Sequence, residues 1–380
     1  MVNRSFWLEK IEQLWARRNI IWLSGIRRAG KTMLCQSLKG TEYFDCELPR
    51  TRALMEDPES FLDGLKGKKV ILDEIHRLAN PAQLLKIAAD HYKTVRIIAT
   101  GSSTLEASVK FKDTLTGRKE TLWLTPLTER DLADFGGASL ERRLLQGGLP
   151  PFFMQPQPPE RDFQEWMDSY WAKDIQELFR LERRASFQRF LELLFVNSGG
   201  IFEASKYAAP CEVSRGTISN YLNAAEATYV AHVIRPFSSH KPTEIVSAPK
   251  VYAFDTGFVC YYRGWTKLRR EDFGGLWEQL VLNEIMANTQ SREVRYWRTK
   301  QGRELDFVIP RRGGAADVIE CKMSAGDFSP AAFAAFRRDY PEGRNFVVCP
   351  EQQRTLVKKI NDLEIHTVSL SQLIRELSTH

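Results

Sequence analysis

Apolar residues near the amino terminus follow two spacings. Between Phe6 and Trp15 they recur at helical intervals, and the uninterrupted run Ile20–Leu23 indicates a buried strand. Helical segments such as Pro81–His91 separate several further apolar runs. Those runs predict strands at Tyr43–Cys46, Val70–Leu72, Val95–Ala99 and Glu120–Leu124. Alternating strands and helices predict an α/β domain over residues 1–135, with a parallel sheet covered on both faces.

The middle of the chain has a helical pattern. Leu149–Pro159 is rich in proline, which disfavours helices and central strands, so we expect a linker there. Helices are expected at Phe163–Leu181 and Ser186–Asn197, and Ile201–Val230 has the pattern of a helix–turn–helix. These features predict a helical linker region at residues 136–185 and a winged-helix-like domain at residues 186–245.

Within that helix–turn–helix pattern, Ser214 is placed to cap the amino terminus of the second helix. Apolar residues at helical spacing predict its buried stripe, and polar residues between them predict its outer face. The expected stripe is Ile218, Tyr221, Leu222 and Ala225. The expected outer residues are Arg215, Thr217, Ser219, Asn220 and Asn223.

The carboxyl-terminal residues 246–380 predict a third, mixed α/β domain. Helices are expected at Trp277–Asn288 and Pro330–Asp339. The strands are expected at Val294–Arg298, Leu305–Ile309, Val318–Lys322 and Asn345–Val348.

The composition is that of a folded, soluble protein, with 43% hydrophobic and 27% charged residues. The net charge of +6 permits a nucleic-acid partner without requiring one. Six cysteines lie far apart without a C-x-x-C pair, so we expect reduced, mostly buried thiols. No signal peptide and no run of about 18 apolar residues is present, so we expect a cytoplasmic protein without a membrane association.

The most specific chemical motif is a complete G-x-x-x-x-G-K-[ST] octet, which follows the strand Ile20–Leu23 and precedes a helical stretch, Thr32–Leu38. Its members are Gly25, Ile26, Arg27, Arg28, Ala29, Gly30, Lys31 and Thr32, and Met33 continues the expected nucleotide contact. In such a loop, backbone N–H groups surround phosphates, Lys31 reaches the terminal phosphates and Thr32 binds Mg²⁺. ATP and Mg²⁺ are therefore the expected ligands; a chance octet is the alternative.

A second motif supplies two carboxylates at the end of another apolar strand. Asp73 and Glu74 follow the apolar run Val70–Leu72 and, as adjacent strand residues, point in opposite directions. Asp73 is expected to hold Mg²⁺ and Glu74 to polarise the attacking water. The alternative is a strand that ends in solvated charges.

Two further positions are candidates near the γ-phosphate. Val95–Ala99 runs into Thr100-Gly101-Ser102-Ser103, where Ser102 or Ser103 would sense the nucleotide; a plain Gly/Ser turn is the alternative. Arg118, after Gly117, is an arginine-finger candidate for a neighbouring subunit, and an ordinary surface arginine is the alternative.

The carboxyl-terminal strands carry a separate set of charged residues. Asp306 lies on the first strand, and Glu320 and Lys322 share one face of the next. Asp306 and Glu320 could hold a divalent ion and Lys322 could stabilise a developing phosphorane charge, which suits phosphodiester cleavage. Glu278, on the preceding helix, could add a third carboxylate. A salt-bridged hairpin is the alternative.

Asp306, Glu320 and Lys322 resemble the D-x(n)-E-x-K signature of the restriction-endonuclease-like superfamily. The chain also contains the segments GIRRAGKT, LDEIHRL, ATGSS, KVYAFDTGFV, GLWEQLVLNEI and YWRTKQGRELDFVI. Because of these segments and that signature, it resembles a prokaryotic family of AAA+-like, archaeal-type ATPases. This resemblance implies a P-loop sheet of order 5-1-4-3-2, then a winged helix and a nuclease-like fold. It also implies the phosphate, magnesium, hydrolytic, sensor and finger roles given above. Arg27-Arg28 departs from the family pattern.

Two functions fit these predictions. The first is a DNA-processing ATPase that forms a homo-oligomer and contacts DNA through basic residues beside aromatic ones. The candidate contacts are Arg215, Lys241, Arg295, Arg298, Lys300 and Arg303, with Tyr296 and Trp297 available for stacking on bases. The second is a regulatory nucleotide switch whose carboxyl-terminal domain is a non-catalytic binding module.

Overall fold

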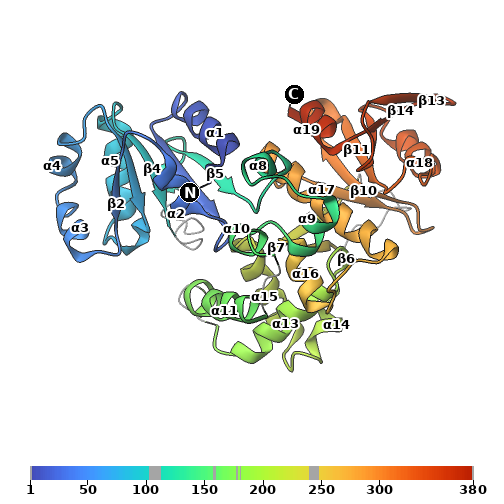
Figure 1. Ribbon diagram of the computed structural model, residues 1–380, viewed down its shortest axis with the longest axis horizontal. Helices are drawn as coiled ribbons and strands as arrows, with labels where there is room; N and C mark the ends of the chain where they lie inside the picture. The colour runs from blue at the N-terminus through green and yellow to red at the C-terminus, as the bar shows by residue number, and fades with distance from the viewer. Residues whose placement is uncertain are drawn as a thin grey trace.

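The protein has two β-sheets connected and covered by helices (Figure 1). The computed structural model describes residues 2–101, 113–156, 160–176, 179, 181–238 and 248–378. The first sheet and its helices lie at one end of the molecule, and the second sheet lies at the other. Across the described ranges, no helix is both long and apolar enough to cross a membrane.

The amino-terminal sheet is parallel throughout and has the order β2-β3-β4-β1-β5. Read from its other edge, this is the order 5-1-4-3-2, so the predicted α/β fold and its strand order are confirmed. The strands are β1 (Ile20–Gly25), β2 (Thr41–Asp45), β3 (Lys69–Asp73), β4 (Arg96–Thr100) and β5 (Glu120–Leu124). The helices between them are α1 (Ser5–Trp15), α2 (Lys31–Ser37), α3 (Pro49–Leu54), α4 (Pro58–Asp63) and α5 (Pro81–His91).

The central strand β1 is buried on both faces, which explains its uninterrupted apolar sequence. Ile20 and Trp22 belong to the core on the side that includes Leu84 and Leu85 of α5. The alternating residues Ile21 and Leu23 belong to the other core, with Trp7 and Ile11 of α1. The Gly25 end of this strand is therefore held between two packed layers.

The region expected to be a linker is folded. Leu149 is buried, and the helix α10 (Pro150–Phe153) begins with two prolines and buries Phe152 and Phe153. The linker prediction was wrong because proline is tolerated in the first turn of a helix, where its missing N–H would have no partner in any case. The neighbouring elements are α8 (Glu129–Asp134), α9 (Leu140–Gln146), α11 (Glu160–Tyr170) and the π-helix η2 (Trp171–Gln176).

The helix–turn–helix pattern corresponds to α14 (Ala204–Ala208) and α15 (Arg215–Ala227), which follow α13 (Arg184–Val196). Ser214 caps α15, because its Oγ accepts a hydrogen bond from the Thr217 N–H at 3.1 Å. The expected apolar stripe of α15 is buried: Ile218, Tyr221, Leu222 and Ala225. The expected outer residues Arg215, Ser219, Asn220 and Asn223 are exposed, and Thr217 is half-buried.

The second sheet has the order β13-β14-β12-β11-β10-β9-β7-β8-β6. Its strands are β6 (Gly200–Ile201), β7 (Ala231–Pro236), β8 (Lys250–Ala253), β9 (Arg295–Arg298), β10 (Glu304–Pro310), β11 (Ala316–Cys321), β12 (Asn345–Val348), β13 (Leu356–Ile360) and β14 (Leu363–Val368). Pairing of β7 with β9 joins strands from the regions predicted as residues 186–245 and 246–380. The associated helices are α16 (Thr256–Tyr262), α17 (Phe273–Thr289), α18 (Ala331–Asp339) and α19 (Leu370–Ser378).

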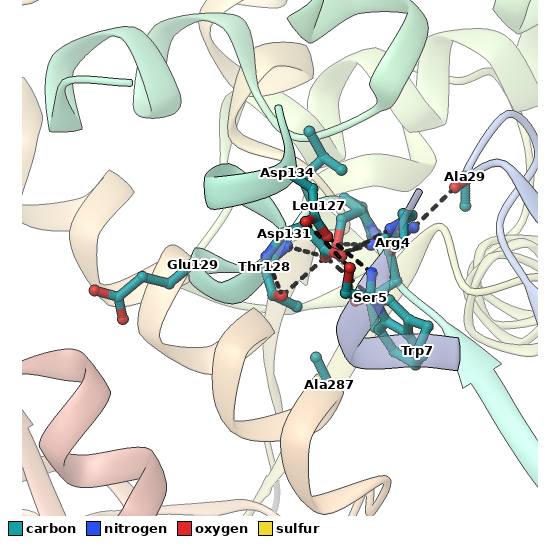
Figure 2. Close-up of polar contacts among 12 residues, drawn as sticks. Arg4, Ser5, Trp7, Ala29, Leu127, Thr128, Glu129, Asp131, Asp134 and Ala287 are labelled. Atoms are coloured by element: carbon teal, nitrogen blue, oxygen red, sulfur yellow. Dashed lines mark hydrogen bonds and ion pairs between the residues drawn. The ribbon is translucent and has the colours of Figure 1, made fainter. Parts of the chain in front are cut away.

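A buried ion pair fixes the amino terminus to the amino-terminal sheet (Figure 2). Arg4 Nη2 lies 2.6 Å from Asp131 Oδ2, and both side chains are almost completely buried. The same guanidinium donates from Nη1 to the carbonyl oxygens of Ala29 and Thr125, at 3.0 and 3.1 Å. Arg4 therefore connects α8 with the octet loop.

Candidate nucleotide-binding site

The octet forms the loop between β1 and α2, and two of its glycines have backbone conformations that other residues rarely adopt. Gly25 has φ 137°, and a Cβ there would lie 2.2 Å from the Leu124 carbonyl oxygen on β5. Gly30 has φ 96° and caps α2. Arg28 also has a positive φ, 64°, so the Arg27-Arg28 pair stands at a tight bend of the loop.

Lys31 lies at the start of α2 with its ammonium directed at its own loop. Its Nζ donates to the Gly25 carbonyl at 2.8 Å and to the Ile26 carbonyl at 3.3 Å. Burial lowers the pKa of Lys31, and the carboxylates of Asp174 and Glu74 oppose that shift. The ammonium is thus a buried cation held by backbone carbonyls, and a phosphate group could replace those weaker acceptors.

Thr32 and Asp73 meet where Mg²⁺ is expected. The Thr32 hydroxyl donates to Asp73 Oδ2 at 3.0 Å, and Asp73 is buried at the end of β3. Tyr43 donates to the same oxygen at 2.5 Å, while Thr100 donates to Oδ1. A hydroxyl and a carboxylate side by side provide the hard oxygen ligands that Mg²⁺ takes beside nucleotide phosphates, so this donor set fits the ion.

Glu74 lies just beyond β3, which ends at Asp73, so the strand alternation expected for this pair does not extend to it. It has φ 55°, and its N–H donates to Thr100 Oγ1 at 3.0 Å. Its Oε2 lies 3.1 Å from His76 Nδ1. The interaction with His76 holds the pKa of Glu74 below its usual range despite burial, so this carboxylate is ionised at neutral pH and can accept a proton or orient a water.

A cavity of about 550 Å³ opens above the loop. This volume falls in the range of small-molecule sites. Arg27, Arg28, Lys31, Thr32 and Glu74 supply its charged and polar part. An apolar part is lined by Val2, Met33, Phe135, Pro150, Pro151 and Met154. Met33 and Met154 are 48% and 60% exposed. Both therefore leave apolar surface free for the ring face of a flat ligand such as a nucleotide base.

The cavity is closed on one side by the helical region that follows α10. Asp174 of η2 lies 2.5 Å from Arg27, measured from Oδ2 to Nε. Trp166 of α11 donates from Nε1 to the Arg27 carbonyl at 3.2 Å. Tyr170 and Lys173 line the same cavity. Arg27, which departs from the family pattern, thus has an ion-pair partner in this chain. Its contacts attach the loop apex to α11 and η2.

The structure brings most of the predicted loop residues to the cavity but not all of them. Gly25, Arg27, Arg28, Gly30, Lys31, Thr32 and Met33 line it, whereas Ile26 and Ala29 are buried in the core beneath the loop. Ser102 and Ser103 lie outside the described residues. Tyr43, His76, Lys173 and Asp174 also contribute to the site, and none of them is predicted from the sequence: His76 lies within LDEIHRL but has no expected role there, and the other three belong to no motif.

Arg118 does not line this cavity. Its Nε lies 2.7 Å from Asp90 Oδ1 on α5, and its Nη1 donates to the Thr114 carbonyl at 3.2 Å. The side chain is about one-third exposed. An action of Arg118 on nucleotide therefore requires a second subunit and remains a prediction.

The carboxyl-terminal charged residues also come together. Asp306 Oδ2 accepts a hydrogen bond from the Cys321 N–H at 2.7 Å, and Lys322 Nζ donates to Glu320 Oε1 at 2.6 Å. The other Glu320 oxygen, Oε2, is buried without a hydrogen-bond partner. Burial, Glu278 and Glu320 raise the pKa of Asp306, and burial likewise raises the pKa of Glu320.

Glu278 is held by residues of β8. Lys250 donates to Glu278 Oε1 at 3.2 Å and is paired with Glu304, and the Tyr252 hydroxyl also donates to Glu278. Although burial disfavours its charge, the carboxylates of Glu278, Asp306 and Glu304 raise the pKa of Lys250. Of the residues that the structure describes, no three His, Cys, Asp or Glu side chains form a group that could hold a metal ion.

The candidate DNA contacts have different surroundings. Arg215, Lys300 and Arg303 are exposed, Arg295 and Arg298 are partly buried, and Lys241 lies outside the described residues. The proposed stacking by Tyr296 and Trp297 is wrong, because these side chains are 0% and 1% exposed. They lie on β9, an inner strand of the second sheet, where both faces are covered. All six cysteines are unpaired, and all but Cys321 are buried, as expected.

The parallel five-stranded sheet with this loop defines a P-loop domain of the AAA type, and comparison with known families agrees. Residues 17–133 match a family model described as an AAA domain. Two models described as domains of unknown function match residues 137–269 and 273–370. These matches, with the loop geometry, support an ATPase domain in the amino-terminal part of the chain.

The chain is also similar to individual proteins. The chain is 28% identical over 309 residues to the uncharacterized protein Rv2008c of Mycobacterium tuberculosis, covering 78% of this chain and 69% of that protein. Among solved structures it is similar to a Walker-type ATPase, PABY2304 of Pyrococcus abyssi, with a TM-score of 0.45, 15% identity, and coverage of 69% and 96%. It is also similar to AMPPCP-bound DnaA from Aquifex aeolicus, with a TM-score of 0.29, 12% identity, and coverage of 57% and 86%.

Proposed function

We propose that the protein binds ATP with Mg²⁺ above the Gly25–Thr32 loop and hydrolyses it. The observation that carries this proposal is that Lys31, Thr32 and Glu74 line one cavity and that Thr32 is hydrogen-bonded to Asp73. Lys31 neutralises the terminal phosphates, Thr32 and Asp73 hold the ion, and Glu74 orients the attacking water. Each role uses a group whose charge and hydrogen-bonding capacity suit it.

Replacing Lys31 with alanine tests the proposal. Phosphate release should fall to background in Lys31→Ala, because no other cation of the loop can follow the terminal phosphates from inside it. Lys39→Ala is the matched control, since Lys39 is exposed just beyond α2 and should retain wild-type turnover. Wild-type turnover in Lys31→Ala would refute the assignment.

We further infer that the protein acts on DNA as a homo-oligomer. The order α13, β6, α14, α15, β7, β8, with β8 paired to both β6 and β7, is the order of a winged helix. The capped helix α15 exposes Arg215, Ser219, Asn220 and Asn223, a mixture of a basic group for phosphates and polar groups for bases. This surface supports DNA as the partner more directly than the net charge does.

The DNA proposal is tested by measuring ATP turnover with single-stranded, duplex and branched DNA. DNA should stimulate turnover in the wild type and less so in Arg215→Ala. Arg161→Ala is the control, because Arg161 is an exposed arginine on a different helix, α11. A lack of both DNA binding and stimulation would favour the regulatory switch. The oligomeric state is read by light scattering with and without nucleotide.

A second candidate activity is metal-dependent phosphodiester cleavage at Asp306, Glu320 and Lys322. The specific observation in its favour is the buried, unpartnered Glu320 Oε2 beside a partly buried Asp306. Two such carboxylates suit a divalent ion, although they are few ligands for one. The protein should then nick or trim DNA in Mg²⁺ or Mn²⁺ but not in EDTA, and Asp306→Ala should lose cleavage while retaining ATP turnover. Equal cleavage by Asp306→Ala would refute this site.

A further inference from the structure

The phosphate end of the cavity contains a carboxylate that the expected hydrolysis chemistry does not use. Asp174 is half-buried on the π-helix η2, lines the cavity and contacts Arg27 at the loop apex, 147 positions earlier in the chain. π-helices are rare and concentrate at functional sites. The contact pairs an anion with a basic group of the loop that is proposed to bind the phosphates.

Asp174 and a triphosphate would compete for the same cations. Both are anionic, and both would interact with Arg27 and with the Lys31 ammonium behind it. Asp174 is the carboxylate with the largest favourable effect on the charge of Lys31, ahead of Glu74 and Asp73. Phosphates brought beside an unmoved Asp174 would face like-charge repulsion in a partly enclosed cavity, so one anion must leave.

We propose that Asp174 is a positioning residue of the nucleotide site, which holds Arg27 and the loop apex in the nucleotide-free arrangement until the terminal phosphates displace it. The neighbouring Lys173 is exposed and lines the same cavity, so its cation favours the phosphates that Asp174 opposes. This inference rests on the proposed binding of ATP at the loop. It assigns to the helical region a part in setting nucleotide affinity.

Hydrogen bonds would transmit a displacement of Asp174 to the helix–turn–helix region. Tyr170 is the last residue of α11, directly before η2, and Thr228 directly follows α15. Their hydroxyl oxygens lie 2.6 Å apart. Next to Thr228, the Tyr229 hydroxyl lies 2.8 Å from the Ser24 hydroxyl on β1. The end of α15 is therefore bonded both to α11, which leads directly into the π-helix that carries Asp174, and to the strand that precedes the loop.

The experiment measures dissociation constants of fluorescent ATP, ADP and AMP analogues. Asp174→Asn should bind ATP and ADP about 10-fold more tightly than the wild type, a typical coupling between two sites, and AMP with less than about 2-fold change, because AMP lacks the terminal phosphates. Asp174→Glu should restore the wild-type values. Lys173→Ala should bind ATP more weakly, whereas Asp174→Asn should bind it more tightly. A general loosening of η2 would not change the affinity in opposite directions at adjacent residues.

The matched control is Asp168→Asn on α11, since Asp168 is an exposed carboxylate paired with Arg184. It should bind all three analogues as the wild type does. If Asp174→Asn and Asp168→Asn behave alike while the wild type binds ATP, the positioning role is refuted and the proposed function stands. If the wild type binds no nucleotide, the proposed function itself fails. Circular dichroism of each variant verifies folding, and Asp174→Ala serves as a second variant.

Discussion

Replacing Asp131 with asparagine should destabilise the protein strongly. Asp131 is completely buried and accepts hydrogen bonds from Arg4 at 2.6 and 3.0 Å, from Trp7 Nε1 at 3.2 Å, and from Thr128 N–H and Oγ1 at 2.8 Å each. Asparagine has nearly the same shape but no charge, and its amide nitrogen cannot accept hydrogen bonds from these donors. The Arg4 guanidinium, 4% exposed, would then be a buried cation without its counterion.

The expected loss follows from that geometry. Removing one partner of a buried ion pair destabilises proteins by about 3–5 kcal/mol. At about 2–4 °C per kcal/mol for a domain of moderate size, the midpoint of thermal unfolding should fall by roughly 6–20 °C. Arg4 also holds the Ala29 carbonyl, so nucleotide affinity should fall in the same variant.

Asp134→Asn is the matched control for this prediction. Asp134 lies on the same helix, α8, and accepts a hydrogen bond from the Ser5 N–H at 2.8 Å, but the contact is exposed. Its loss should change stability by less than about 1 kcal/mol. Differential scanning calorimetry of both variants makes the comparison. A midpoint for Asp131→Asn within about 2 °C of that for Asp134→Asn would refute the buried-charge reasoning.

The pH dependence gives an independent test of Asp131. Burial alone would raise its pKa, but Arg4 and Thr128 lower the pKa by more, and it lies below its usual range. A carboxyl group whose pKa is lower in the folded state stabilises the fold above its unfolded pKa of about 4, and this contribution disappears as the pH falls through the folded pKa. The stability difference between the wild type and Asp131→Asn should therefore shrink below about pH 4.

Further predictions concern ATP hydrolysis and the buried carboxyl group of Glu284. Glu74→Gln should keep ATP binding and lower turnover by ~100-fold or more, measured as Kd and phosphate release, and failure to bind would make Glu74 a ligand or a structural residue. Equimolar mixing of Arg118→Ala with Lys31→Ala subunits should partly restore ATP turnover if Arg118 acts in trans, and no restoration argues against that role. Burial raises the pKa of Glu284 to about 8, so the folded state keeps a proton that the unfolded chain releases near pH 4.5. The free energy of unfolding should fall as pH rises between these values, and Glu284→Gln should remove this dependence in thermal unfolding curves at pH 5 to 9.

The sequence predicts elements well where local pattern alone determines them. The expected helix Pro81–His91 and the expected strands Glu120–Leu124 and Asn345–Val348 have the same bounds in the structure. The octet follows the carboxyl end of β1, and Asp73 and Glu74 lie at the carboxyl end of β3, which β4 separates from β1 in the sheet. Periodicity and steric requirements of the backbone are sufficient for these features.

The remaining features depend on contacts between distant residues. Asp174 has no motif around it, and its importance comes from Arg27 in another layer of the fold. Tyr296 and Trp297 are interleaved with arginines, which predicts an exposed stacking surface, yet strand pairing places them inside a sheet. Proline spacing similarly suggested a linker where Phe152 and Phe153 are buried. In each case tertiary packing decided the outcome.

Helix α17 is bonded at its two ends to strands of the two sheets and so connects them mechanically. Glu278, near its amino end, belongs to the charged cluster with Lys250, whereas Gln290, just after its carboxyl end, bonds both the Trp123 N–H and carbonyl on β5. Twelve residues at 1.5 Å each place these ends about 18 Å apart along a rigid rod. A shift of β5 along the axis of α17 would therefore be transmitted along this helix toward Glu278.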